Sequence, residues 1–206
     1  MNVVDGAGRW RYLEDLPAST LLTDGDVLAR RQLLSSARVL LVQLQQPAAT
    51  ALTAARIGRS SGALVVLDGV PDDNAMIDEL VGSADVVRAD AREAELLAGE
   101  PLRDVAAVVR AARALLAKGL RVVAFAAGDE GNVIVWPGGE VVIPLGDTVV
   151  ADTTGAGDAF TAALAVSLLR GAEPAEAGRN ASDAAASTVR HIGGRPRLST
   201  RGTAGP

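Results

Sequence analysis

The sequence predicts an α/β fold in which helices cover both faces of a mostly parallel β-sheet. Two observations lead to this prediction. Short apolar runs rich in Val and Leu alternate with longer Ala- and Leu-rich segments, and the connections between them are short. Hydrophobic residues make up 49% of the 206-residue chain and charged residues 22%, which suits one domain with a buried core and excludes a disordered chain.

Four short apolar runs are the candidate parallel strands. Each is apolar at nearly every position, as expected of a strand that is covered on both faces. They are Arg38–Leu44, Ala63–Asp68, Ala84–Ala89 and Arg121–Ala126.

The segments before, between and after these strands predict helices. The clearest is Asp104–Lys118, where apolar residues recur about every 3.6 positions and Gly119 follows as a C-terminal stop. The other four are Asp24–Ser36, Pro47–Ser60, Asn74–Val81 and Arg92–Leu97.

The pattern changes in the last third of the chain. Asn132–Trp136 and Glu140–Leu145 flank the turn formers Pro137–Gly139, which predicts an antiparallel hairpin at one edge of the sheet. Two Ala-rich helices are expected next, over Ala156–Arg170 and from Glu173 to His191. Since no interior linker separates these elements, we expect one domain over residues 1–196 and a flexible, Gly- and Pro-rich tail over 197–206.

Composition excludes several classes of function. The absence of Cys removes disulfides, thiolate nucleophiles and Cys-based metal sites, and the single His191 argues against a His-rich metal site or a Ser-His-Asp triad. Aromatic residues at 2% and a net charge of −5 argue against nucleic-acid binding. The first twenty residues contain no export signal, and no run approaches the ~20 apolar residues that span a bilayer. We therefore expect a cytoplasmic protein without nucleic-acid or membrane partners.

A glycine-rich loop that opens directly into a helix is the most informative segment. Gly155 and Gly157 flank Ala156, Asp158 follows, and the next residues are strong helix formers. Unpaired N–H groups and the positive end of the helix dipole meet at such a start and favour an anion. On residue types alone, two interpretations of Asp158 stay open: a favourable charge at a helix N-terminus, or a general base beside a transferring phosphoryl group.

The string Asp152–Asp158, DTTGAGD, resembles the DTxGAGD signature of the ribokinase-like (PfkB) carbohydrate kinase family. Further segments resemble the family's pattern in the same order, from about Asn2 to Pro196: Leu40–Pro47, Ala63–Pro71, Ala84–Gly99, Ala124–Trp136 and Arg179–Pro196. The resemblance is to the C-terminal, nucleotide-binding portion of the family. It implies a three-layer α/β/α sheet, mostly parallel with an antiparallel hairpin at one edge.

The resemblance also implies a reaction, in which ATP phosphorylates a hydroxyl of a sugar. Asp158 would be the general base on that hydroxyl, and the backbone N–H groups of Gly155, Ala156 and Gly157 would form the anion hole for the γ-phosphoryl group. Asp152 and Gln45 would lie beside the acceptor sugar.

Cofactors and the nucleotide pocket follow from the same resemblance. Glu93 would hold Mg²⁺ through water, and Asp152 with Thr154 are candidates for a monovalent cation, K⁺. The nucleotide pocket would be lined by Asp90, Ala126, Gly128, Gly131 and Ser182.

The sequence departs from the family pattern at several positions. Asp90 stands where the family usually has Asn, Ala126 where it has Thr, and Gln45 where it has Glu. Asp5–Tyr12 resembles a hairpin from late in the family's N-terminal half, so we expect the first strands and the β lid to be missing. Two functions therefore stay open: a sugar kinase, with a homodimer as a candidate assembly, or a non-catalytic nucleotide-binding remnant or one half of a split kinase.

Overall fold

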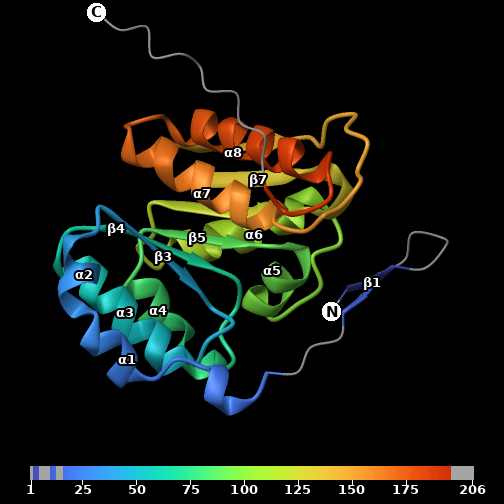
Figure 1. The fold of residues 1–206 in the computed structure, drawn as a ribbon. Helices are drawn as coiled ribbons and strands as arrows, with labels where there is room; N and C mark the ends of the chain where they lie inside the picture. Colours follow the sequence, from blue (N-terminus) through green and yellow to red (C-terminus); the bar gives the residue numbers. More distant parts are fainter. Residues whose placement is uncertain (1, 5–9, 13–15, 196–206) are drawn as a thin grey trace, which may run out of the picture.

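The computed structural model describes residues 2–4, 10–12 and 16–195, and its centre is a six-stranded sheet in the order β3-β4-β5-β6-β7-β8 (Figure 1). The first four strands are parallel and the last two join antiparallel, as predicted. The strands are β3 (Val39–Gln43), β4 (Leu64–Asp68), β5 (Val86–Ala89), β6 (Val122–Ala126), β7 (Asn132–Trp136) and β8 (Gly139–Ile143).

A second, two-stranded sheet lies at the start of the chain. It pairs β1 (Asn2–Val4) with β2 (Trp10–Tyr12) in antiparallel fashion. The hairpin expected from Asp5–Tyr12 therefore has its first strand a few residues earlier, at Asn2–Val4. Residues 5–9 lie outside the described residues, as does the tail predicted at 197–206.

Helices form two layers around the six-stranded sheet, so the three-layer α/β/α prediction is confirmed. One layer packs its core with Leu67, Val87 and Phe125, and the other with Val66, Val86 and Ile134. The first layer holds α3 (Ala48–Ser60), α4 (Ile77–Gly82), α5 (Ala91–Ala98) and α6 (Val105–Leu116), and the second holds α7 (Ala156–Leu169) and α8 (Pro174–Val189) (Figure 1).

The helix predicted over Asp24–Ser36 is divided. A capping box between Thr23 and Asp26 starts α1 (Asp24–Ala29), and α2 (Arg31–Ser36) begins after Arg30, whose φ of −108° and ψ of 12° are not helical. Both short helices pack on α3. No Gly or Pro marks the break in the sequence.

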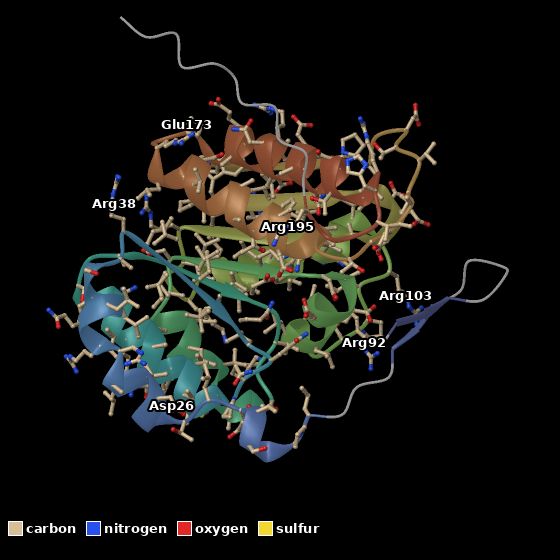
Figure 2. The ribbon with its side chains drawn as sticks, viewed as in Figure 1. Asp26, Arg38, Arg92, Arg103, Glu173 and Arg195 are labelled. Carbon is tan, nitrogen blue, oxygen red and sulfur yellow. The ribbon has the colours of Figure 1, made fainter. Side chains whose placement is uncertain are left out.

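Charged side chains lie on the outside of these layers. Figure 2 shows Asp26, Arg38 and Glu173 pointing away from the sheet, and all three lie at the surface rather than in the core. Among the described residues, no helix is long and apolar enough to span a bilayer. Two of the buried polar residues, Asp68 and Thr161, meet at the carboxyl end of β4.

Candidate active site

The glycine-rich loop ends at Gly155, which is the N-cap of the 14-residue helix α7. Gly155 has a φ of 75°, in the left-handed region that glycine adopts at little cost. A Cβ on Gly155 would also stand 2.3 Å from the backbone oxygen of Gly194. The loop before α7 and the loop after α8 can approach this closely only because position 155 has no side chain.

Asp152 fastens the same two loops. Its Oδ1 accepts from the N–H of Thr154 at 2.9 Å, and its Oδ2 accepts from the N–H of Gly193 at 3.2 Å. Hydrogen bonds from the Thr154 side chain, and then from the Thr154 and Gly193 amides, lower the pKa of Asp152. The ionised Asp152 side chain thus joins the loop before α7 to the loop after α8 through these two hydrogen bonds, the Asp152 clasp.

Unused hydrogen-bond donors gather at the start of α7. The Ala156 N–H donates to the Thr153 oxygen at 3.2 Å, whereas the amides of Gly155, Gly157 and Asp158 have no hydrogen-bond partner among the described residues. The Asp158 side chain is exposed and forms no hydrogen bond or ion pair with that part of the chain. Free amides and a free carboxylate therefore stand side by side at a helix N-terminus, where an anion is favoured.

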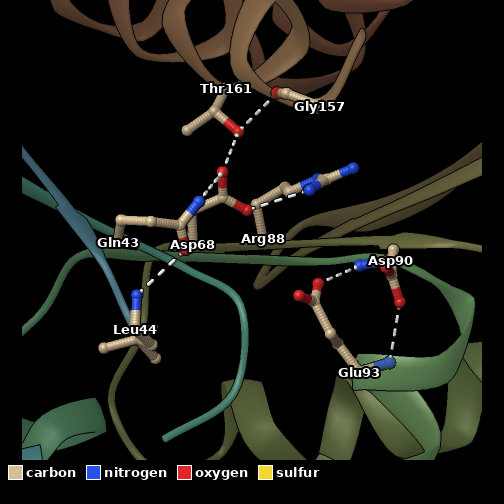
Figure 3. Close-up of polar contacts among 8 residues, drawn as sticks. All are labelled: Gln43, Leu44, Asp68, Arg88, Asp90, Glu93, Gly157 and Thr161. Carbon is tan, nitrogen blue, oxygen red and sulfur yellow. Dashed lines mark hydrogen bonds and ion pairs between the residues drawn. The ribbon is translucent and has the colours of Figure 1, made fainter. Parts of the chain in front are cut away.

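A polar row crosses the sheet beneath α7. Gln43, Asp68 and Arg88 are neighbours in register on β3, β4 and β5. The Arg88 Nη1 donates to Asp68 Oδ1 at 3.0 Å, and the Gln43 Nε2 lies 3.5 Å from Asp68 Oδ2 (Figure 3). The side chain of Asp68 is only 7% exposed and that of Arg88 18%, so this ion pair is shielded from water.

Thr161 links the row to α7. Its hydroxyl lies 3.0 Å from Asp68 Oδ2 and 2.9 Å from the Gly157 carbonyl oxygen, and its single proton can be donated to either (Figure 3). Arg88 also touches the first turn of the helix, because a Cβ on Gly157 would stand 2.9 Å from its Nη1. The sheet face and the start of α7 are thereby held in one polar cluster.

Asp90 and Glu93 form a capping box at the start of α5. Asp90 Oδ1 accepts from the Glu93 N–H and Glu93 Oε2 accepts from the Asp90 N–H, each at 2.8 Å (Figure 3). Burial is the main cause of a raised pKa at Glu93. Since Oε1 of Glu93 forms no hydrogen bond with the described residues, it fits a contact to a hydrated Mg²⁺, which keeps several of its waters. No group of three or more acidic or His side chains that could hold a metal directly occurs among the residues described.

The residues predicted to line a nucleotide pocket follow β5 and β6. Ala89 pairs with Phe125, so Asp90, the first residue after β5, follows beside Ala126, the last residue of β6. Gly128 and Gly131 then turn the chain with φ values of 58° and 111°. After that turn, the Asn132 Nδ2 donates to the Ser182 Oγ of α8 at 3.3 Å, which brings Ser182 to the same end of the sheet.

The glutamine that contacts the polar cluster is Gln43 rather than Gln45, the one predicted to face the sugar. Gln45 is exposed and has no side-chain hydrogen bond with the described residues, whereas Gln43, two positions earlier, contacts Asp68. Sequence reasoning also missed Asp68, Arg88 and Thr161. Asp68 and Arg88 carried one signal, since each is a charge in an otherwise apolar strand near its carboxyl end, the usual place for a ligand site in a parallel sheet.

Comparisons with known proteins agree on one family. The model of the pfkB family carbohydrate kinases matches residues 2–201. A ribokinase of Haemophilus influenzae is 32% identical over 162 residues, which are 79% of this chain and 53% of the relative.

Two solved structures show the same fold in relatives. A ribokinase from Thermotoga maritima superposes with a TM-score of 0.77 at 29% identity, over 94% of this chain and 63% of that one. An Arabidopsis thaliana ribokinase complexed with ribose and ATP superposes with a TM-score of 0.70 at 26% identity, over 85% of this chain and 57% of that one. The chain thus spans between half and two thirds of the length of these relatives.

Proposed function

Since the chain belongs to the PfkB family of carbohydrate kinases, we propose that it carries out the transfer of the γ-phosphoryl group of ATP to a hydroxyl of a sugar. The observation that carries this proposal is the start of α7, where the unpartnered amides of Gly155, Gly157 and Asp158 adjoin the unpartnered Asp158 carboxylate. Preorganised donors beside a base are what phosphoryl transfer needs from a protein.

Atoms and charge balance in the proposed step. The oxygen of the sugar hydroxyl forms a bond to the γ-phosphorus while its proton passes to the Asp158 carboxylate. The bond between the γ-phosphorus and the bridging oxygen of ADP breaks, and ADP leaves with that oxygen. Negative charge on the transferring group is stabilised by the free amides at the start of α7, with Ala156 holding the turn through its bond to Thr153.

The remaining predicted residues would bind and orient the two substrates. Asp90, Ala126, Gly128, Gly131 and Ser182 would hold the nucleotide. Mg²⁺ would neutralise phosphate charge and would be held through water by Glu93.

Asp152 would act mainly through the loop clasp, next to Thr154 and a K⁺ ion, and Gln45 would face the sugar. We also predict that the protein acts in the cytoplasm and that it forms a homodimer.

A second candidate is nucleotide binding without transfer, or transfer that requires another chain for the sugar site. The chain spans 53% of the length of the Haemophilus influenzae ribokinase, and the Asp152 oxygens are already hydrogen-bonded within the loops. In this case the chain would bind ATP without transferring its γ-phosphoryl group by itself.

Release of ADP separates the two candidates. The purified chain would be incubated with MgATP and a panel of sugars that begins with ribose, which the Arabidopsis thaliana relative is described with. Sugar-stimulated ADP release supports the kinase. Tight binding of ATP with no stimulation by any sugar supports the second candidate, and failure to bind ATP contradicts both.

A further inference from the structure

Arg88 is a charged residue in a sheet face that is apolar around it apart from its neighbours Asp68 and Gln43. On β5 it follows the buried Val86 on the same face, and in register it lies between Asp68 of β4 and the buried Ala124 of β6. Placing a charge there is costly unless it is paired. Asp68 supplies the partner, yet an apolar pair would fill the same space without the cost of burying two charges. The pair therefore calls for a reason beyond packing.

The guanidinium of Arg88 is held against the first turn of α7. A Cβ on Gly157 would stand 2.9 Å from Nη1 and 3.1 Å from Nη2, both closer than side chains readily allow. Gly157 does not have a positive φ, so its backbone conformation would accept another residue. Gly157 thus leaves room for the Arg88 guanidinium, which would have to shift if residue 157 carried a side chain. The Phe160 ring, one turn further along α7, lies 6.0 Å from the guanidinium carbon, at the limit of a cation–π contact.

Asp68 on the neighbouring strand β4 fixes the orientation of the Arg88 guanidinium. Asp68 holds Nη1 at 3.0 Å and is itself held by the Thr161 hydroxyl at 3.0 Å. Nη1 is the only nitrogen of Arg88 for which a side-chain hydrogen bond occurs among the described residues, and Figure 3 shows the rest of the guanidinium directed away from Asp68. A positive charge with donors to spare is therefore locked beside the unpartnered amides of Gly157 and Asp158.

We propose that Arg88 is the protein's own cation for the phosphate-binding end of α7, positioned by Asp68. It adds its positive potential to that of the helix N-terminus and so raises affinity for the nucleotide's phosphates, whose negative charge the carboxylates of Asp158, Asp90 and Glu93 oppose. Arg88 is a positioning and electrostatic residue that acts beside the amide donors. The inference rests on the proposed function, since it assigns the anion at α7 as a nucleotide phosphate.

A purely structural role makes a different prediction. If Arg88 only neutralises buried Asp68, then removing both charges together repairs the defect of removing Arg88 alone. If Arg88 acts on the phosphates, the double variant stays defective because it lacks the cation.

The test measures MgATP and ADP binding by titration calorimetry for Arg88→Met, Asp68→Asn, the double variant and Arg88→Lys. Arg113→Met serves as the control, because it removes an exposed arginine that pairs with Glu140. We expect Arg88→Met and the double variant to bind about ten-fold more weakly, the scale of one charge-assisted contact. Arg113→Met should bind as tightly as the unsubstituted chain. Asp68→Asn keeps an acceptor oxygen for Nη1 but loses the ion pair that positions Arg88, so it should fall between the unsubstituted chain and Arg88→Met, as should Arg88→Lys.

The outcomes distinguish failure of the role of Arg88 from failure of the proposed kinase function. Affinity in the double variant equal to that of the unsubstituted chain overturns the role of Arg88 and leaves the proposed function intact. If Arg88→Met does not fold, as judged by its circular dichroism, the neutral double variant and Arg88→Lys decide the matter. An unsubstituted chain that binds neither nucleotide overturns the proposed function itself.

Discussion

Gly155 and Gly194 meet backbone to backbone, with the Gly194 oxygen where a side chain of residue 155 would begin, 2.3 Å from the position of its Cβ. This contact joins the loop before α7 to the loop after α8. Together with the Asp152 clasp, it fixes the point from which the free amides of α7 project. The precision of the proposed anion site therefore depends on two loops that are about forty residues apart in the sequence.

Gly155→Ala should unfold more easily and lose nucleotide binding. The substitution combines a left-handed φ of 75° with a clash against Gly194. Gly62→Ala is a matched control, because Gly62 has a φ of 78° but no atom lies within 4 Å of the place that its Cβ would take. We expect Gly155→Ala to lower the free energy of unfolding by about 1–3 kcal/mol more than Gly62→Ala in urea denaturation. Equal losses would show that the loop contact is unimportant.

The Asp152 clasp should make stability depend on pH in acid. Its pKa is lowered in the folded chain, so the carboxylate stabilises the fold above its unfolded pKa of about 3.9, and this contribution is lost as pH falls through the lower folded value. The difference in unfolding free energy between the parent chain and Asp152→Asn should be constant near neutral pH and should shrink below about pH 4. A difference that does not change with pH would contradict the clasp.

Glu93 should behave in the opposite sense. Burial raises its pKa, so the ionised side chain costs folding free energy, which is absent at low pH and grows as pH rises from the unfolded pKa of about 4.3 through the folded value. Gln can still accept from the Asp90 N–H, so Glu93→Gln should be at least as stable as the parent chain at pH 7. The same variant should need more Mg²⁺ for half-maximal ADP release. A stability loss at pH 7 with an unchanged Mg²⁺ requirement would contradict this assignment.

Thr161 should matter more than another buried threonine of the same layer. Thr161→Val removes the hydroxyl that supports Asp68, and a buried charge with one donor fewer should lower the unfolding free energy by about 1–2 kcal/mol. Thr188 is 0% exposed, but its hydroxyl only donates back to the Ala184 oxygen within α8. Thr188→Val should therefore cost less than about 1 kcal/mol. If Thr188→Val is the more damaging change in thermal unfolding, the support of Asp68 by Thr161 is not significant.

Much of the fold follows from local sequence pattern. The run Leu64–Asp68 is buried at every position, as its continuous apolar character predicts, and α7 begins at Ala156 as the glycines before it indicate. The division at Arg30 could not be predicted, because no Gly or Pro marks it in the sequence.

The candidate site was predictable only where its residues are adjacent in the sequence. The turn at Gly155–Asp158 is one continuous motif. The Asp90–Glu93 capping box is likewise visible in the sequence as an Asp followed three residues later by a Glu, ahead of an apolar helix face. The cluster of Gln43, Asp68 and Arg88 depends on the register of three strands, and its contact with Gly157 depends on how α7 crosses the sheet. Neither is encoded in local spacing.

In the proposed reaction Asp158 takes the proton of the attacking hydroxyl, and the most direct measurement of that role is sugar-dependent ADP release by Asp158→Asn. Its ATP affinity would be measured in parallel by calorimetry. We predict a rate at least about 100-fold below that of the parent chain with ATP affinity retained, since general-base catalysis contributes on that order. Sugar-stimulated turnover by Asp158→Asn at the parent rate would contradict the role of Asp158 as the base.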